Sequence, residues 1–279
     1  MDLPFRFSCR TLDLSSTQVM GVLNVTPDSF SDGGQFLTHQ AALQRAEEMV
    51  SQGASIIDVG GESTRPGAAK VSLQEELDRV CPVVEKITSN LDVVLSVDTS
   101  KPTLMSEVIK LGVGMINDVR AFTDPESVKV VAGHDVAICV MHMQGQPSMM
   151  QDEPSYASVT LEVKKFLQER VGSLIGGGVS RDRIVVDPGF GFGKTLQHNM
   201  QLLRDIGAVR DLGFPVLVGL SRKSMFSQIL NKPVSDRLFG SVSAASIAAF
   251  QGAGIIRTHD VQETKDAVLV VDAINKLAK

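Results

Sequence analysis

Short apolar runs alternate with longer amphipathic stretches along most of this chain of 279 residues. The short runs are rich in β-branched residues and almost free of polar ones, which is typical of strands covered on both faces of a parallel sheet. The longer stretches repeat apolar residues at helical spacing, which predicts the helices that cover such a sheet. The predicted strands are residues 19–24, 55–59, 93–97, 114–117, 136–141, 183–186, 215–219 and 254–257. The predicted helices include residues 40–52, 73–89, 103–111, 161–175, 200–209 and 261–277.

Eight repeats of strand and helix predict a (β/α)8 TIM barrel, an α/β fold, as one domain over residues 1–279. Eight units in about 260 residues match the count and the length of that fold. An open doubly wound sheet is the alternative, because it shows the same alternation. Residues 5–14 alternate loosely between apolar and polar, and we interpret them as an N-terminal hairpin that closes the barrel bottom.

The carboxyl ends of the predicted strands favour the barrel. Each apolar run breaks into polar or glycine residues where it ends, and a barrel gathers all eight ends into one ring, where the active sites of barrel enzymes lie. An open sheet would concentrate such residues at one switch point instead. The polar residues at these ends are Asn24, Asp58, Glu62, Asp98, Asn117, Asp118, His142, Asp187, Ser221, Arg222, Lys223, Arg257 and His259.

Composition and charge remove several classes of protein. Aromatic residues make up 5% of the chain, and 27 Lys and Arg against 32 Asp and Glu give a formal net charge of −5. Nucleic-acid-binding proteins usually carry a basic stripe with interleaved aromatics, so we expect no nucleic-acid partner. No apolar run approaches about 18 residues, the length of a membrane span. Because residues 1–16 also lack the order of a signal peptide, we expect neither secretion nor a membrane partner.

The cysteines indicate the compartment. Cys9, Cys81 and Cys139 form no C-x-x-C pair, and an odd number leaves one over. This is not a disulfide framework, and a reducing cytoplasm fits it best.

The first two strand ends lead into polar loops. Residues 24–34 resemble a mobile lid, although ordinary turn chemistry accounts for the same composition. The amide oxygen of Asn24 suits a hard cation such as Mg²⁺. In the second loop, glycines allow close approach of a ligand, and Thr64 and Arg65 offer a hydroxyl and a forked cation for phosphate oxygens. A solvated surface arginine is the alternative for Arg65.

Two carboxylates follow later strands. Asp98 and Asp187 each end an apolar run, where an ionised carboxylate is costly unless it meets donors. Capping of the next helix is the alternative, above all for Asp98. With Asn117 nearby, this set suits a flat heterocycle that carries an amino-pyrimidinone edge.

The segment GFGFGKT at residues 189–195 resembles a nucleotide-binding loop but fits neither pattern. The P-loop requires glycine where Pro188 stands, and the third glycine of the dinucleotide fingerprint, Gly193, comes one residue too early. We interpret the segment as a flexible loop that presents Phe192 to a substrate ring.

Basic residues gather at the last two strand ends. Ser221 and Lys223 follow the seventh strand, and Arg257 and His259 close the eighth. The loops after these two strands are the usual phosphate position in barrels. With Arg65 across the mouth, they predict a cationic ring in an acidic protein, although a lone lysine at a strand end is usually solvated.

Five motifs together resemble the dihydropteroate synthase family of folate biosynthesis. The resemblance covers essentially the whole chain. The motifs are MGVLNVTPDSFSDGG at residues 20–34, IDVGGESTRPG at 57–67, DPGFGFGK at 187–194, GLSRKS at 219–224 and RTHDV at 257–261.

This resemblance implies a transferase that condenses p-aminobenzoate with (7,8-dihydropterin-6-yl)methyl diphosphate to give 7,8-dihydropteroate and diphosphate, with Mg²⁺ as cofactor. It also implies a homodimer and a sulfonamide target. The pterin would lie against Asp98, Asn117, Asp187 and Lys223. Asn24 would help to hold Mg²⁺, and Thr64, Arg65, Arg257 and His259 would bind the diphosphate. Ser221, Phe192, Pro66 and Thr64 would frame p-aminobenzoate, and Lys223, Arg257, His259 and Asp98 would be the catalytic residues.

Two alternatives stay open at this point. A pterin-dependent methyltransferase-like barrel would share the pterin carboxylates, but it has no diphosphate to bind, which argues against it. A non-catalytic pterin-binding relative would have lost loop residues that this chain retains.

Overall fold

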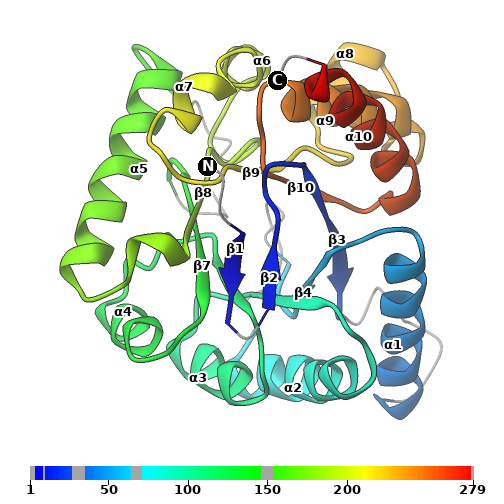
Figure 1. Ribbon diagram of the computed structural model, residues 1–279, viewed down its shortest axis with the longest axis vertical. Helices are drawn as coiled ribbons and strands as arrows, with labels where there is room; N and C mark the ends of the chain where they lie inside the picture. The colour runs from blue at the N-terminus through cyan, green and yellow to red at the C-terminus, as the bar shows by residue number, and fades with distance from the viewer. Residues whose placement is uncertain (1–3, 9, 27–34, 64–70, 146–153, 278–279) are drawn as a thin grey trace.

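The eight predicted strands form one parallel sheet that curls into a barrel (Figure 1). The structure is a computed structural model that describes residues 4–8, 10–26, 35–63, 71–145 and 154–277. The sheet order is β8-β7-β6-β5-β4-β3-β10-β9, and a bridge between Val186 and Val216 joins its two edges. The strands are β3 (Gln18–Asn24), β4 (Ile56–Gly60), β5 (Val94–Asp98), β6 (Met115–Asp118), β7 (Ala137–Met141), β8 (Ile184–Asp187), β9 (Leu217–Gly219) and β10 (Ile255–Thr258). The predicted (β/α)8 barrel is therefore confirmed.

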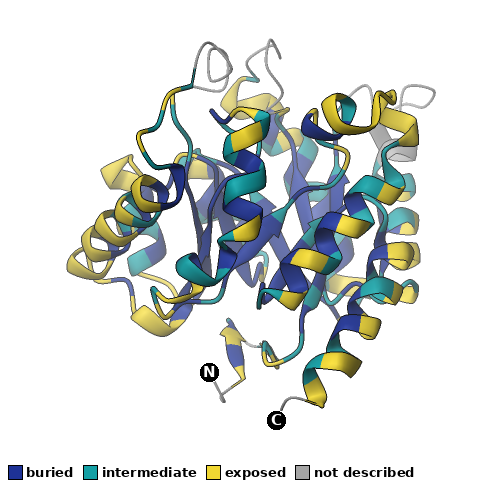
Figure 2. Ribbon diagram, turned by 90° about the horizontal axis from the view of Figure 1, so that it is seen from above, coloured by how far each residue is buried: buried dark blue, intermediate teal, exposed yellow. Residues whose placement is uncertain are grey.

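Helices surround this barrel on its outer face, and the strands are buried beneath them (Figure 2). Apolar helix faces and outward strand residues form one continuous core between the two layers. The helices are α1 (Gln35–Ser51), α2 (Leu73–Asn90), α3 (Pro102–Lys110), α4 (Pro125–Ala132), α5 (Val159–Gly176), α6 (Leu196–Arg204), α7 (Ile206–Arg210), α8 (Met225–Leu230), α9 (Leu238–Phe250) and α10 (Val261–Lys276). No helix in the described ranges is long and apolar enough to cross a membrane.

A second core fills the barrel interior near the amino ends of the strands. Successive strand residues point to opposite faces, so every second residue faces inward. The first inward layer is apolar and buried, and it includes Met20, Ile56, Val94, Met115, Val185, Leu217 and Ile255. The next inward positions toward the carboxyl ends are polar on five strands, where they are Asp58, Ser96, Asn117, Asp187 and Arg257. The barrel is therefore a closed core at one end and a polar mouth at the other.

The N-terminal hairpin closes the apolar end, as predicted. β1 (Phe5–Phe7) pairs antiparallel with β2 (Arg10–Leu12). The rings of Phe5 and Phe7 meet edge to face at 4.9 Å and join the interior core, where Phe7 is 1% exposed. Figure 2 shows the hairpin, next to the N-terminus, at one end of the barrel.

Candidate active site

The polar mouth is built by strand register. Asn24 on β3 pairs with Gly60 on β4, Gly60 with Asp98 on β5, and Asp98 with Asn117 on β6. Partners in a parallel sheet lie at the same height, so these residues form one row across four strands. Asp187 ends β8 and Arg257 lies on β10. The structure thus brings predicted site residues from five strands to one end of the barrel.

Arg257 lies at the centre of the charges in this mouth. Its Nε donates to Oδ2 of Asp58 at 2.6 Å, and its Nη2 donates to Oδ2 of Asp98 at 3.3 Å. The Nδ2 of Asn117 donates to the same oxygen of Asp58 at 3.3 Å. The expected cationic ring is therefore not made of unpaired cations, because Arg257 is bound by two carboxylates.

Asp58 lies at the end of a predicted strand, but the sequence did not indicate a role for it. Its side chain is fully buried, and its Oδ1 has no hydrogen-bond partner within the described residues. A signal was present in the sequence, since Asp58 is the charged residue of a strand that is otherwise apolar and glycine. Its neighbours in space, Arg257 and Asn117, come from strands far away along the chain, so the sequence alone did not reveal the cluster.

The carboxylates in the mouth are held in an environment that disfavours their charge. Burial raises the pKa of Asp98 to about 7, and the charge of Asp58 adds to this effect while Arg257 opposes it. Burial also raises the pKa of Asp187, against a hydrogen bond from the amide of Gly189 at 2.7 Å. Perturbed carboxyl groups that gather in a concave mouth are typical of functional sites.

Lys223 and Phe192 lie together at the rim. The Nζ of Lys223 is 4.4 Å from the ring centroid of Phe192, a cation–π contact. It also donates to the carbonyl oxygen of Phe190. Burial lowers the pKa of Lys223 to about 8, although the charge of Asp187 acts to raise it. The Phe192 ring is thus placed beside a cation of the mouth.

Ser221 and His259 connect the loops after β9 and β10. The Oγ of Ser221 accepts a hydrogen bond from the amide of His259 at 3.2 Å and lies 3.0 Å from its Nδ1. The adjacent Arg222 donates through Nε to Asp260 at 3.1 Å. Two neighbouring bonds therefore fix this side of the rim.

The 189–195 loop, which the sequence predicts to be flexible, makes several hydrogen bonds, both within itself and to α6. The buried Nζ of Lys194 donates to the carbonyl oxygens of Gly189 and Phe192, and Oδ1 of Asn199 accepts from the amide of Gly191 at 2.7 Å. The loop is thus held by its own residue Lys194 and by Asn199 on α6.

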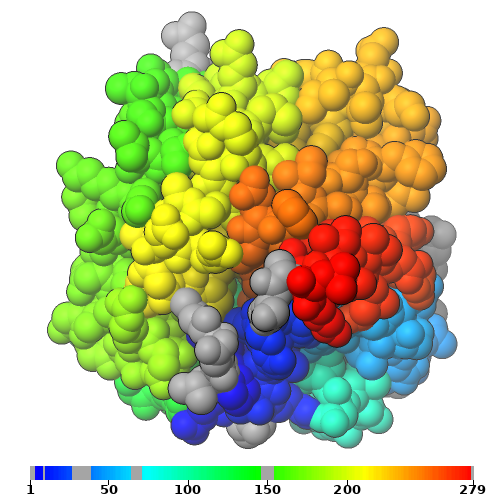
Figure 3. All heavy atoms as spheres, turned by 45° about the horizontal axis from the view of Figure 1, so that its top comes forward, coloured from blue at the N-terminus to red at the C-terminus, as the bar shows by residue number. Residues whose placement is uncertain are grey.

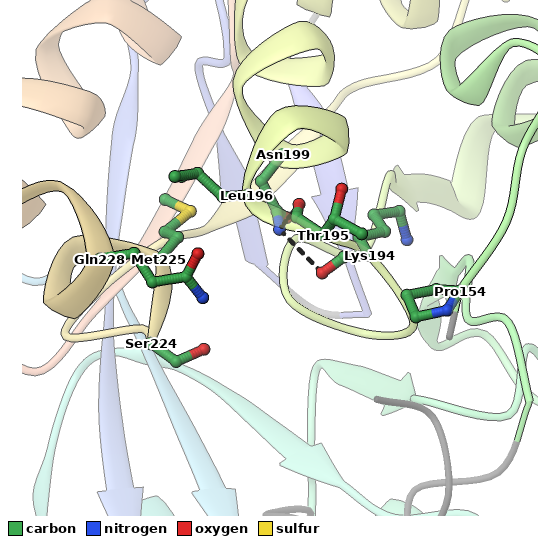
Figure 4. Close-up of a pocket in the computed structure, with 8 residues that line it drawn as sticks. All are labelled: Pro154, Lys194, Thr195, Leu196, Asn199, Ser224, Met225 and Gln228. Carbon is green, nitrogen blue, oxygen red and sulfur yellow. Dashed lines mark hydrogen bonds between the residues drawn. The ribbon is translucent and has the colours of Figure 1, made fainter. Parts of the chain in front are cut away.

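A cleft of about 290 Å³ lies on the outer side of the same loop, between α6 and α8 (Figure 4). Thr195 and Lys194 lie along one wall, and Ser224, Met225 and Gln228 lie opposite. The predicted site residues in the described part of the chain do not line it, so the cleft is separate from the polar mouth.

Three predicted site residues, Thr64, Arg65 and Pro66, lie outside the described residues, as does most of the first polar loop. The other predicted site residues are described.

The family model described as pterin binding enzyme matches residues 20–259. The dihydropteroate synthase of Escherichia coli K12 is 50% identical over 263 residues, which cover 94% of this chain and 93% of that protein. The chain belongs to the dihydropteroate synthase family. It is therefore a transferase, and the relatives support this activity over a methyltransferase-like barrel or a non-catalytic binding protein.

Solved structures of the family have the same fold. The Yersinia pestis dihydropteroate synthase with a sulfonamide drug complex superposes with a TM-score of 0.93 at 50% identity, covering 99% of this chain and all of that one. The Xanthomonas albilineans dihydropteroate synthase in complex with 7,8-dihydropteroate gives a TM-score of 0.89 at 40% identity, covering 98% of this chain and 99% of that one.

Asn24 is the residue that the family resemblance assigns to Mg²⁺. No group of three or more His, Cys, Asp or Glu in the described part of the chain is arranged to hold a metal ion. A Cβ built on the neighbouring Gly60 would lie 3.7 Å from Oδ1 of Asn24, so this oxygen lies beside the end of β4. Mg²⁺ commonly takes one or two protein oxygens and completes its shell with substrate phosphates and water. A single amide oxygen in this mouth fits that pattern.

Proposed function

We propose that the polar mouth joins p-aminobenzoate to (7,8-dihydropterin-6-yl)methyl diphosphate, giving 7,8-dihydropteroate and diphosphate. The observation that carries the proposal is the cluster of Asp58, Asp98, Asn117 and Arg257 at the bottom of a mouth whose rim holds Phe192 beside Lys223. The cluster offers hydrogen-bond acceptors and donors to the edge of a flat ring. The aromatic ring of Phe192 and the ammonium group of Lys223 lie at the rim of the mouth.

The pterin ring is proposed to bind against Asp98, Asn117, Asp187 and Lys223. Carboxylate oxygens accept from ring N–H and amino groups, and the amide of Asn117 both donates and accepts. Asp58 supports this set from below, because it receives hydrogen bonds from Arg257 and Asn117. Its role is to orient these two side chains rather than to contact the substrate.

The diphosphate is proposed to meet Arg257 and His259, together with Thr64 and Arg65 from the second loop. The bonds of Arg257 to carboxylates use Nε and Nη2, and Nη1 is the donor proposed to meet the diphosphate. As the bond between the pterin methylene carbon and the diphosphate oxygen breaks, negative charge grows on the leaving group. Preorganised cations stabilise that charge without reorganisation.

The aryl amine is proposed to enter over Ser221, Phe192, Thr64 and Pro66. Its nitrogen is neutral at pH 7, forms the new C–N bond and then releases a proton, so the reaction needs no strong general base. Ser221 is fixed by its bonds to His259, and Phe192 by its contact with Lys223.

Asn24 is proposed to hold Mg²⁺ together with the diphosphate oxygens. When bound, the ion supplies positive charge to the leaving group. Asn24 is the last residue of β3, at the carboxyl end of the strand, and would supply one amide oxygen to the ion.

A homodimer is proposed to form through α8, α9 and α10. The surface of these three helices exposes large apolar side chains, among them Phe239 at 76%, Phe250 at 59% and Val270 at 63%. Helices α9 and α10 lie side by side, in orange and red in Figure 3. Contiguous apolar patches on a soluble surface mark protein–protein contacts, and a second copy of this chain is the proposed occupant.

A reducing compartment, the cytoplasm, remains our proposal for the location. Cys81 and Cys139 are free thiols. Burial raises the pKa of both, so they remain protonated and unreactive at neutral pH.

Incubation of the purified protein with both substrates and Mg²⁺ tests the proposal. We expect 7,8-dihydropteroate and diphosphate in equal amounts, and a loss of turnover when EDTA removes the metal. Binding of the pterin diphosphate without product would indicate the non-catalytic alternative. Transfer of a methyl group from a methylated pterin would indicate the methyltransferase.

A further inference from the structure

Lys194 is a buried cation that the proposed reaction does not use. Its side chain is 3% exposed. Its Nζ donates to the carbonyl oxygens of Gly189 at 2.8 Å and Phe192 at 3.0 Å, and lies 2.9 Å from Nδ1 of His142. All three acceptors are uncharged. Burial lowers the pKa of Lys194 to about 7, although the charge of Asp187 acts to raise it. Burial of such a polar group is costly, so an apolar residue would serve better if this position only filled space.

The three contacts use the full donor capacity of the ammonium group. A lysine ammonium carries three donors and no acceptor, and here each donor has one near acceptor. The contact with His142 requires Nδ1 to be unprotonated. Burial and the charge of Lys194 lower the pKa of His142 to about 3, so its ring is neutral at pH 7. Lys194 therefore ties two carbonyls of the 189–195 loop to the segment that follows β7.

The loop needs such a tie because its backbone is intrinsically permissive. Gly189, Gly191 and Gly193 all have positive φ, between 63° and 78°. Glycine adopts positive φ at no steric cost, and it has no side chain that would restrict its backbone. A Cβ on Gly189 would lie 1.8 Å from the carbonyl oxygen of His142, so the loop packs directly on that backbone. The hydroxyl of Tyr156 adds a hydrogen bond to the carbonyl of Gly193 at 2.7 Å.

The same loop carries Phe192 and contacts Lys223 at the rim of the mouth. The carbonyl oxygen of Phe190 accepts a hydrogen bond from Lys223, and the ring of Phe192 lies 4.4 Å from the Nζ of Lys223. A shift of the loop thus moves the aromatic ring and changes its contact with the cation. In contrast, Asp98 and Asn117 lie on β5 and β6 and make none of the hydrogen bonds described for the loop. The other two proposed pterin contacts, Asp187 and Lys223, each share one hydrogen bond with the loop but lie on β8 and after β9, outside it.

We propose that Lys194, with His142 as its acceptor, is a positioning residue for the aryl-amine subsite, because it fixes the loop that carries Phe192. The inference rests on the proposed function, in which Phe192 frames p-aminobenzoate. Lys194 contacts no substrate and acts through the loop backbone.

The test compares Lys194→Met, which removes the donors and keeps an unbranched chain, with Arg183→Met. Arg183 is a matched control, since it is 7% exposed and donates to the carbonyls of Val131 at 3.2 Å and Val136 at 3.1 Å near the opposite end of the barrel. For Lys194→Met we expect KM for p-aminobenzoate to rise about tenfold, the order of one lost positioning contact. We expect Kd for 6-hydroxymethyl-7,8-dihydropterin, from calorimetry, to stay within about threefold in both variants. Arg183→Met lowers Tm and leaves KM unchanged.

Tyr156→Phe is a milder second variant, and it decides the matter if Lys194→Met does not fold. It removes one hydrogen bond from the loop, and we expect a rise of about two- to threefold in KM for p-aminobenzoate, the weight of one neutral hydrogen bond. If the wild type is active and KM for p-aminobenzoate is unchanged in every variant that folds, the inference on Lys194 is overturned and the proposed function is not affected. An equal loss of dihydropterin affinity in Lys194→Met would also overturn it. A wild type that forms no dihydropteroate would instead contradict the proposed function.

Discussion

Arg257 shows how a single side chain organises the charges of the mouth. It is bound by Asp58 and Asp98, and burial, which acts to lower its pKa, is outweighed by these carboxylates, so the pKa is raised. A guanidinium held in this way is fixed in direction. The pairing also means that a change at Asp58 alters Arg257, Asp98 and Asn117 together, so single substitutions in this cluster will not have additive effects.

Asp98 gives a prediction on pH at the residue scale. Because its pKa is raised to about 7, the acid form dominates below pH 7 and the carboxylate above it. If the carboxylate of Asp98 accepts a hydrogen bond from the pterin ring, the affinity for the pterin rises with pH. We expect Kd for 6-hydroxymethyl-7,8-dihydropterin to be about tenfold weaker at pH 6 than at pH 8, as the ionised fraction requires. Calorimetry with this ligand excludes the ionisation of a diphosphate.

Asp98→Asn is the control for that prediction. The variant keeps the shape of the side chain and cannot titrate, so its affinity is expected to be lower and flat between pH 6 and pH 8. An equally steep pH dependence in the variant would assign the effect to another group.

The sequence identified Asp98, Asn117, Asp187 and Arg257 because each stands where an apolar run ends, and the barrel brings those ends together. It did not identify the role of Asp58 or the pairing of Arg257. Both depend on which strands lie opposite each other once the sheet closes, and strand order is a property of the whole barrel. Lys194 was noted as part of a motif, but its burial depends on the packing of the loop against His142.

At the scale of elements, the strands were easier to predict than the helices. The strand cores match the structure within a residue or two at their ends because continuous apolar runs have few alternatives. The predicted helix over residues 200–209 is instead two helices, α6 and α7, which meet at Asp205. Helix α9 was not predicted, because its sequence is apolar on nearly all sides and several of its apolar residues are exposed, which removes the helical period.

The N-terminal hairpin gives a prediction at this scale. Phe7 is 1% exposed in the interior core, at the end of the barrel opposite the mouth. Phe7→Ala is expected to lower the free energy of unfolding by about 3–5 kcal/mol, the usual cost of a large aromatic lost from a core. Turnover at 25 °C is expected to remain near that of the wild type.

Urea denaturation and steady-state assays check this expectation together. A variant with normal stability would show that the hairpin does not seal the barrel. A stable variant with lost turnover would show that the hairpin affects the mouth.

At the scale of the whole molecule, the net charge of −5 hides a local arrangement of opposite charges. The mouth holds Arg257 and Lys223 among buried carboxylates, and the negative average describes the surface around it. The charge excluded a nucleic-acid partner in the sequence interpretation, but it carried no information on the mouth. The apolar surface of α8, α9 and α10 could not be predicted either, because exposure is known only once the helices pack.

The proposed dimer gives a prediction at this scale. Phe239 is 76% exposed on α9, so Phe239→Asp adds a charge to the apolar surface without disturbing the core. Sedimentation velocity is expected to find a dimer for the wild type and a monomer for the variant, since burial of an unpaired charge in an interface is costly. Glu169→Lys, a charge change at an exposed position of α5, is expected to leave the dimer intact.

The central claim is that the cluster around Arg257 at the mouth of the barrel is the transferase centre. The most direct test measures the rate of 7,8-dihydropteroate formation and the affinity for diphosphate in Arg257→Ala and His259→Ala, with Arg183→Met as the control. We predict that turnover falls about 10²- to 10³-fold, as when one preorganised charge-stabilising donor is removed, and that diphosphate binds more weakly. Turnover and diphosphate affinity equal to the wild type in both variants would contradict the account.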